Sequence, residues 1–144
     1  MECIIFVGIQ ASGKSTFYQT NFFKTHMRIN LDMLRTRHRE QIYLTASFEA
    51  KQPFVIDNTN PTIEERKKYI DAAKRNRFKV VGYYFEPDYE LSYARNELRE
   101  GTAKIPEVGL KSTLKNLQMP TYAEGFDTLY LVRSVDGEFE VEEM

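Results

Sequence analysis

The sequence contains very little cysteine and histidine: Cys3, His26 and His38 are the only such residues among 144. A single cysteine cannot form a disulfide framework, so a reducing compartment is expected. Structural zinc sites typically use four cysteine or histidine ligands, and this chain has three candidates in all. These shortages argue against a disulfide-rich secreted fold and against a zinc centre.

Long apolar runs and an excess of charge of one sign are also missing. No apolar run approaches the about 20 residues that a membrane-spanning helix needs, and no signal-peptide pattern opens the chain. We therefore expect a cytoplasmic protein without a membrane partner. The 20 basic and 21 acidic residues give a net charge of -1. This balance argues against strong non-specific binding of long nucleic acid, so a phosphate-rich partner must be held locally.

Aromatic residues are abundant, with ten Phe and nine Tyr, and 42% of all residues are hydrophobic. A chain of this size and composition can bury a core of its own. It shows no repeat, low-complexity tract or linker. We expect one domain over residues 1–144.

The most informative stretch is residues 8–15, a Gly-x-x-x-x-Gly-Lys-Ser loop after the apolar run of residues 3–7. Its glycines let backbone N–H groups turn toward phosphate oxygens, and a helix that opens at Lys14 adds its positive dipole end. Lys14 would reach the β and γ phosphates, and Ser15 would bind Mg2+. A ligand-free glycine turn would leave Lys14 without a role. We predict that ATP is held by Gly8, Ala11, Ser12, Gly13, Lys14, Ser15 and Thr16.

Apolar runs alternate with helical patterns along the whole chain, which predicts a three-layer α/β fold with a parallel sheet of about five strands. In addition to the sheet, we expect a small helical lid over about residues 95–120. Residues 137–144 are either an edge strand or a frayed tail. Strands are expected at residues 3–7, 27–30, 54–57, 80–85 and 129–132, and helices at 14–22, 32–50, 60–75, 88–100 and before Pro120.

One helix start is predicted from its capping residues. Asn60 suits the cap and Pro61 the first helical position. The buried face of this helix would include Ile63, Ile70 and Ala73.

Asp57 ends an apolar run at the edge where a doubly wound sheet carries its ligand crevice. There it would help to position Mg2+ next to Ser15, directly or through water. The alternative is an Asx turn that leads into Asn58 and Asn60.

Asp32 follows the second expected strand, on the phosphate side of the sheet. A kinase needs an acid that accepts the proton of the acceptor hydroxyl, and Asp32 is the best candidate for this general base. An acid in the first turn of a helix is also stabilised by the helix dipole without any catalytic role.

Two groups of arginines remain. Arg95 and Arg99, four residues apart on one expected helix, have no acid at helical spacing, which favours an external anion such as the transferring phosphate. A solvated basic face is the alternative. Arg35 begins a second basic cluster near Asp32 that also contains Arg37, His38 and Arg39; Arg35 could instead simply pair with Asp32.

Taken together, these motifs resemble the P-loop polynucleotide 5'-hydroxyl kinases, both the phage type and the kinase domain of the animal DNA end-repair enzyme. In that family the acid in the place of Asp32 is the general base. The arginine in the place of Arg35 contacts the acceptor end, and arginines like Arg95 and Arg99 clamp the donor phosphates. The resemblance implies these roles here, with Asn58 also on the substrate side. It covers nearly the whole chain, through Gly8-x4-Gly13-Lys14-Ser15-Thr16, Asn30-Leu31-Asp32, Ile56-Asp57-Asn58-Thr59-Asn60-Pro61, Arg95-Asn96-x-x-Arg99, Ile105-Pro106 and Glu124-Gly125-Phe126.

Two departures limit this resemblance. Family members commonly have arginine before the base, where this chain has Leu31, so one acceptor-phosphate contact is missing. Many relatives also carry a fused phosphatase or ligase domain, whereas this sequence has no Asp-x-Asp pair for a phosphatase. A stand-alone member of bacterial or phage type is expected.

Three hypotheses follow for the function. The first is a kinase that moves the γ-phosphate of ATP to the 5'-hydroxyl of a DNA or RNA end. The second is a small-molecule kinase for a nucleoside, sugar or antibiotic, favoured by the neutral charge and Leu31. The third is a nucleotide-binding switch module with no phosphoryl acceptor.

Overall fold

The structure is a computed structural model that describes residues 1–144. Its strands are β1 (Glu2–Val7), β2 (Met27–Ile29), β3 (Phe54–Ile56), β4 (Lys79–Phe85), β5 (Thr128–Val135) and β6 (Glu138–Glu143). Its helices are α1 (Lys14–Asn21), α2 (Leu31–Leu34), α3 (Arg37–Ala50), α4 (Ile63–Arg75), α5 (Tyr89–Glu97) and α6 (Glu107–Asn116), with short 3-10 helices η1 (Gly101–Ala103) and η2 (Tyr122–Glu124).

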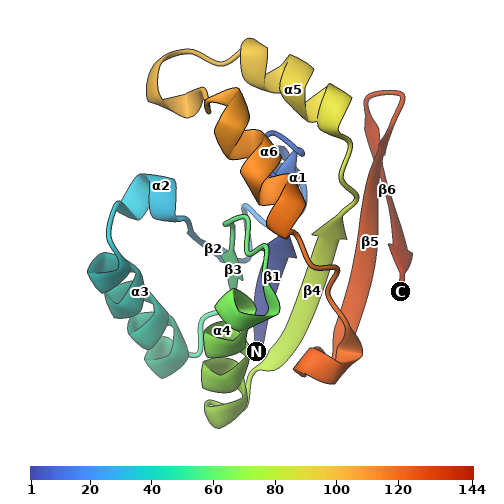
Figure 1. Cartoon of the computed structure of the whole chain (residues 1–144). Coiled ribbons are helices and arrows are strands. Elements are labelled where there is room, and N and C mark those ends of the chain that lie inside the picture. The colour runs from blue at the N-terminus through green and yellow to red at the C-terminus, as the bar shows by residue number, and fades with distance from the viewer.

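All six strands form one sheet in the order β2-β3-β1-β4-β5-β6 (Figure 1). The first five are parallel, and β6 pairs antiparallel with β5 at the edge. The predicted α/β fold is therefore confirmed, and residues 137–144 supply an edge strand. No helix has the length and apolar character needed to cross a membrane.

Side chains of β1 alternate between two cores, one on each face of the sheet. Cys3 and Ile5 belong to the core covered by α3 and α4, whereas Ile4 and Phe6 belong to the core covered by α1. Burial on both faces explains why the run is continuously apolar rather than alternating.

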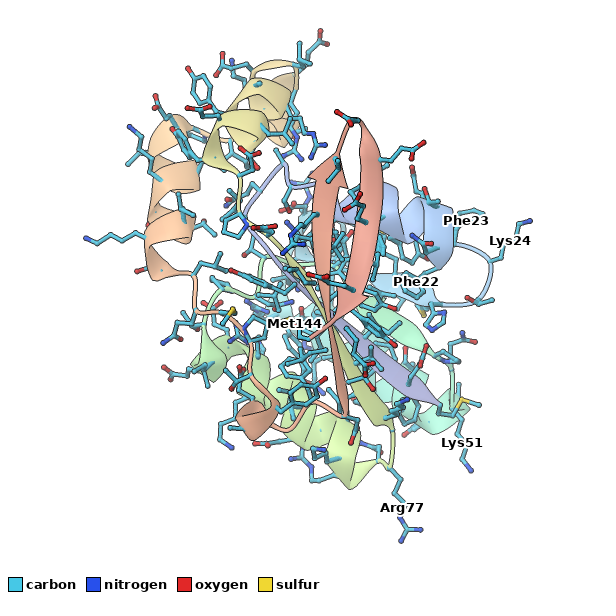
Figure 2. All side chains as sticks on the ribbon, turned by 90° about the vertical axis from the view of Figure 1, so that its right-hand side faces the viewer. Phe22, Phe23, Lys24, Lys51, Arg77 and Met144 are labelled. Atoms are coloured by element: carbon cyan, nitrogen blue, oxygen red, sulfur yellow. The ribbon has the colours of Figure 1, made fainter.

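The sheet topology brings the phosphate loop and the predicted acids to one edge. β1 lies between β3 and β4, so the loops after β1, β2 and β3 meet at the carboxyl ends of the strands, where such sheets bind ligands. In Figure 1 helices α5 and α6 lie above this edge. Figure 2 shows the turn residues Lys51 and Arg77 at the opposite end of the molecule.

The predicted continuous helix over residues 32–50 is wrong, because the chain breaks between α2 and α3. Arg35 has φ 76°, which ends α2. The side chain of Thr36 then accepts a hydrogen bond from the backbone N–H of Arg39 and caps α3. A local side-chain cap thus replaces helical bonding at the break.

The predicted cap at Asn60 is also wrong. Thr62 caps α4 instead, since its hydroxyl accepts from the backbone N–H of Glu65 at 3.2 Å. Asn60 is buried with φ 45°, and its side-chain amide donates to the carbonyl of Phe6 at 2.8 Å. Its amide nitrogen thus joins this loop to β1, and the residue lies two positions before Thr62, where α4 is capped.

Two other helix predictions need correction. Ile70 and Ala73 are buried as predicted, but Ile63 is 42% exposed because it lies at the solvent-facing start of α4. Helix α5 ends at Glu97, not near residue 100. The buried side chain of Asn96 exchanges hydrogen bonds of 2.6 and 2.8 Å with the backbone of Ile105, which folds the intervening segment back on the helix.

A buried ion pair supports the loop beneath the site. Arg66, with no exposed side-chain surface, donates to Glu124 through Nε at 2.7 Å and through a terminal nitrogen at 3.0 Å. Its other terminal nitrogen donates to the carbonyl of Asn60 at 2.9 Å. The pair therefore ties α4 and η2 to the segment that follows β3.

We expect Arg66→Met to lower the free energy of unfolding by about 3–5 kcal/mol, because Glu124 would keep a buried charge without its partner. Urea unfolding monitored by circular dichroism measures this loss. The double variant Arg66→Met/Glu124→Leu should be less damaged than Arg66→Met alone. Equal or larger damage in the double variant would contradict this account of the pair.

Candidate active site

The loop between β1 and α1 has the backbone that the phosphate-loop prediction requires. Gly13 has φ 95°, in the left-handed region that favours glycine. A Cβ at this position would also lie 2.8 Å from the ring of Phe139 on β6. Glycine at position 13 is thus required both for the turn and for the approach of the edge strand.

Lys14 is buried within this loop. Its ammonium group donates to the carbonyls of Gly8 at 3.1 Å and Ile9 at 2.7 Å, with Ser12 Oγ at 3.4 Å. Burial lowers the pKa of Lys14 to about 8, although the carboxylates of Asp57 and Asp32 act in the opposite direction. The ammonium group is thereby held where phosphate oxygens would meet it.

Ser15, Asp57 and Arg28 form a hydrogen-bonded cluster beside the loop. Ser15 Oγ donates to Asp57 Oδ2 at 3.0 Å. Arg28 Nε donates to the same carboxylate oxygen at 2.8 Å, and its terminal nitrogen lies 3.0 Å from Ser15 Oγ. Hydroxyl and carboxylate oxygens are ligands that Mg2+ prefers, and the bridging guanidinium is itself a cation, so the predicted pair fits a divalent cation.

Sequence reasoning missed Arg28. The available signal was a basic residue inside a short apolar strand, two positions before Asn30. That signal could not reveal its partners, because Ser15 and Asp57 lie 13 and 29 residues away along the chain.

Asp32 lies in the first turn of α2, which is tied to the segment after β3. Asn30 caps this helix, and its side-chain amide also donates to the carbonyl of Asp57 at 2.6 Å. Asn58 accepts from the backbone N–H of Leu31 at 2.9 Å. These two bonds fix the exposed carboxylate of Asp32 beside the phosphate loop.

Asn58 was predicted to lie on the substrate side. In the structure, both the oxygen and the nitrogen of its side-chain amide form hydrogen bonds within the protein. Besides accepting from Leu31, it donates to Glu40 Oε2 at 3.3 Å. Glu40 is buried and also accepts from Tyr69 and Arg37. This network supports α2 from below, and Glu40 is a second residue that the sequence did not single out.

A hollow of about 280 Å3 brings most of the predicted residues together. Asp32, Arg99 and Ile105 line it together with Lys14. The hollow is lined by Gln10, Ala11, Gly13, Lys14, Ser15, Thr16, Asn30, Leu31, Asp32, Asp57, Asn58, Thr59, Arg99 and Ile105.

Arg95 does not line this hollow. Its guanidinium lies 3.5 Å from the carbonyl of Ala11 and 3.4 Å from Ser134 Oγ, on the β5 side of the loop. The shared helix face predicted for Arg95 and Arg99 is wrong, because α5 ends at Glu97. The two arginines instead approach the phosphate loop from different sides.

Arg35 does not line the hollow that contains Lys14. Arg35 and Asp32 line a hollow of about 520 Å3, together with Arg28 and Arg99. The ion pairs made by arginine involve Arg28 and three others, Arg37, Arg66 and Arg133. Arg35 and Asp32 therefore form no ion pair with each other, and both remain free for a ligand.

Residues 36–120 match a family described as an AAA domain. The matched part includes Asp57, Arg95 and Arg99 and begins after the phosphate loop.

Curated relatives and solved structures are also similar to this chain. The bifunctional polynucleotide phosphatase/kinase of Schizosaccharomyces pombe is 33% identical over 129 residues, which cover 87% of this chain and 32% of the relative. A relative from Acanthamoeba polyphaga mimivirus, named for the same two activities, is 30% identical over 138 residues, with 91% and 33% covered. The chain thus spans about a third of the length of these relatives.

The structure of Kti12 from Chaetomium thermophilum in complex with ADP-AlF3 is 16% identical, with a TM-score of 0.68 over 93% of this chain and 90% of that one. At this level of identity the likeness shows the fold alone.

The lowered pKa of Lys14 predicts that stability depends on pH. Between about pH 8 and 10.5 the unfolded chain holds a proton that the folded chain has lost, so the free energy of unfolding should rise with pH by about 3 kcal/mol across this window. Urea unfolding at several pH values, compared with Lys14→Met, isolates this rise. Lys24→Met, at an exposed lysine, is the control and should show the same pH dependence as the parent. If the free energy of unfolding of the parent and of Lys14→Met changed with pH in parallel, the prediction would be contradicted.

Removal of Arg28 should strengthen divalent-cation binding at Ser15 and Asp57, since the guanidinium occupies oxygens that a metal would need. We expect Arg28→Met to bind Mn2+, a spectroscopic substitute for Mg2+, with a dissociation constant about tenfold lower, measured by electron paramagnetic resonance. Its melting temperature without metal should fall. Arg75→Met, at an exposed arginine of α4, is the control; unchanged or weaker Mn2+ binding in Arg28→Met would refute the idea.

Proposed function

The chain belongs to the family described as an AAA domain, and on this premise we propose that it is an ATP-dependent kinase that phosphorylates the 5'-hydroxyl of a DNA or RNA end. One observation carries the proposal. The phosphate loop, the carboxylate of Asp57, the carboxylate of Asp32 and the guanidinium of Arg99 line a single hollow. A phosphoryl donor, its cation and an acceptor hydroxyl can therefore meet there.

On the donor side, backbone N–H groups of the loop and Lys14 would bind the β and γ phosphates of ATP. Phosphate oxygens would replace the Gly8 and Ile9 carbonyls as partners of the Lys14 ammonium group. Arg99 in the hollow and Arg95 on the other side of the loop would neutralise negative charge that develops on the transferring group.

Mg2+ fits the oxygen pair of Ser15 and Asp57, and when bound it would neutralise the donor phosphates. Arg28 bridges the same two oxygens and would have to release them. Ser15 and Asp57, which lie 42 positions apart, would each supply one oxygen ligand to the cation.

On the acceptor side, Asp32 would orient the hydroxyl and take its proton. The carboxylate is exposed and forms no ion pair, so it is available for this role. Arg35 would contact the phosphate next to the acceptor hydroxyl.

A lid over about residues 95–120 is part of the proposal. Helix α6 is joined to the phosphate loop by a hydrogen bond of 3.0 Å from the side chain of Gln10 to Thr113. The carbonyl oxygen of the Gln10 side chain is buried without a hydrogen-bond partner. A movement of α6 over a bound nucleotide would break or rebuild this contact, which would couple the lid to the loop.

The polynucleotide acceptor is supported by the names of the two curated relatives and by the basic surface beyond Asp32. A small-molecule acceptor on the same scaffold is the competing function, since Leu31 stands where an additional arginine would contact nucleic acid.

We expect transfer of labelled γ-phosphate from ATP, with Mg2+, to a 5'-hydroxyl oligonucleotide, and a kcat lower by about 10^2 to 10^4 in Asp32→Asn because the general base is lost. Asp71→Asn, at a half-exposed aspartate of α4 that pairs with Lys67 away from the site, should retain parental kcat.

A panel of mononucleosides and small alcohols, assayed beside the oligonucleotide, separates the competing functions. Labelling of a small alcohol but of no oligonucleotide would assign a small-molecule kinase. ATP binding with no labelled acceptor at all would support a switch module and reject the kinase. Full activity of Asp32→Asn would remove Asp32 from the mechanism.

A further inference from the structure

A groove beside β2 continues the acceptor side of the site. It is a hollow of about 400 Å3, and it shares Arg28 with the hollow that contains Asp32 and Arg35. The two hollows therefore adjoin along the edge of the sheet, where β2 is the outermost strand and α2 lies beside it (Figure 1). This β2 groove is lined by Met27, Arg28, Met33, Leu34, Arg39 and Tyr43.

The exposed side chains of the β2 groove have the chemistry of a nucleotide-binding surface. Met33 is 57% exposed and Tyr43 is 41% exposed, although both are large and apolar enough for a core. An exposed aromatic ring offers a face on which a nucleobase can stack, and a thioether packs well beside it. A volume of about 400 Å3 lies within the range of small-ligand sites.

The charge of the groove also suits a phosphate backbone. Arg39 takes part in no ion pair, and its guanidinium makes one hydrogen bond within the chain, to the carbonyl of Leu34 at 3.3 Å. Arg35 is likewise free of carboxylates. Glu40, the nearest acid along α3, is buried and engaged by Arg37 and Tyr69. The open arginines therefore follow a path outward from Asp32 in a chain whose net charge is only -1.

We propose that the β2 groove binds the second and third nucleotides of a single-stranded acceptor. Tyr43 stacks on a base, and Arg39 contacts a backbone phosphate. This inference rests on the proposed function, because the 5' end must lie at Asp32 for the strand to enter the groove. It makes the enzyme select a strand end by length rather than by sequence, since stacking accepts every base.

Kinetics with acceptors of increasing length test the groove. For a nucleoside 3'-phosphate, a dinucleotide, a trinucleotide and a hexanucleotide, each with a 5'-hydroxyl, KM of the parent should fall up to three nucleotides and then level off. Tyr43→Ala and Arg39→Gln should each raise KM for the hexanucleotide about tenfold and leave kcat within about twofold. DNA and RNA series, run in parallel, show which backbone the groove prefers.

Two conservative comparisons separate recognition from damage to the fold. Tyr43→Phe keeps the ring face and should restore the parental KM. Arg39→Gln should reduce the slope of log KM against log salt concentration by about one, the amount expected for one lost phosphate contact. A loss of packing alone would not change this slope. Tyr93→Ala and Arg75→Gln, at exposed residues of α5 and α4 outside the groove, are the matched controls.

A parental KM that does not change with acceptor length would overturn the proposal. So would variants that raise KM for the nucleoside 3'-phosphate as much as KM for the hexanucleotide. If the parent phosphorylates no acceptor, the proposed function fails. In that case fluorescence anisotropy of a labelled hexanucleotide decides the groove separately: tenfold weaker binding by Tyr43→Ala supports it, and equal binding rejects it.

Discussion

The hydrogen bonds of residues 57–60 are the interaction on which the site depends. Asp57 accepts at its carbonyl from Asn30, and Asn58 holds the first residue of α2. The carbonyl of Thr59 accepts from the backbone N–H of Gly8 at 3.0 Å, and Asn60 donates to β1. One four-residue segment therefore fixes the phosphate loop on one side and the proposed general base on the other.

Buried charged groups hold this segment in place from two directions. Arg66 and Glu124 brace Asn60 through α4 and η2, and Glu40 braces Asn58 through α3. Buried charges stabilise a protein only when they are paired and hydrogen-bonded, and removal of a single partner is strongly destabilising. These buried contacts therefore make Arg66, Glu124 and Glu40 sensitive to substitution, and they also hold residues 57–60 in one position.

Two of the cationic groups at the site, Lys14 and Arg28, already have partners within the protein. Lys14 is satisfied by loop carbonyls, and Arg28 bridges the two oxygens that are proposed to bind the cation. A nucleotide and its cation would therefore exchange existing interactions for new ones, rather than enter an empty site. Asp32, Arg35 and Arg39 differ from these groups because they have no ionic partner, and they lie on the side where the acceptor is proposed to bind.

The sequence by itself determined the phosphate loop, the parallel α/β sheet and the position of Asp57, because each follows from local backbone needs or from apolar runs that must be buried on both faces. The sequence also predicted the limits of α1 and of most strands to within a residue or two. It missed the break at Arg35 and misplaced the cap of α4 and the end of α5. Those three boundaries depend on side-chain hydrogen bonds at Thr36, Thr62 and Asn96.

Tertiary structure alone decided which charged residues meet. Arg28 lies on β2, Ser15 on α1 and Asp57 directly after β3. Arg95 and Arg99 reach the loop from different sides because α5 stops between them. Periodicity describes which face of one element a residue occupies, whereas these contacts join elements through the order of strands in the sheet. The partners of a charge are therefore set by the packed fold, even where the charge itself is plain in the sequence.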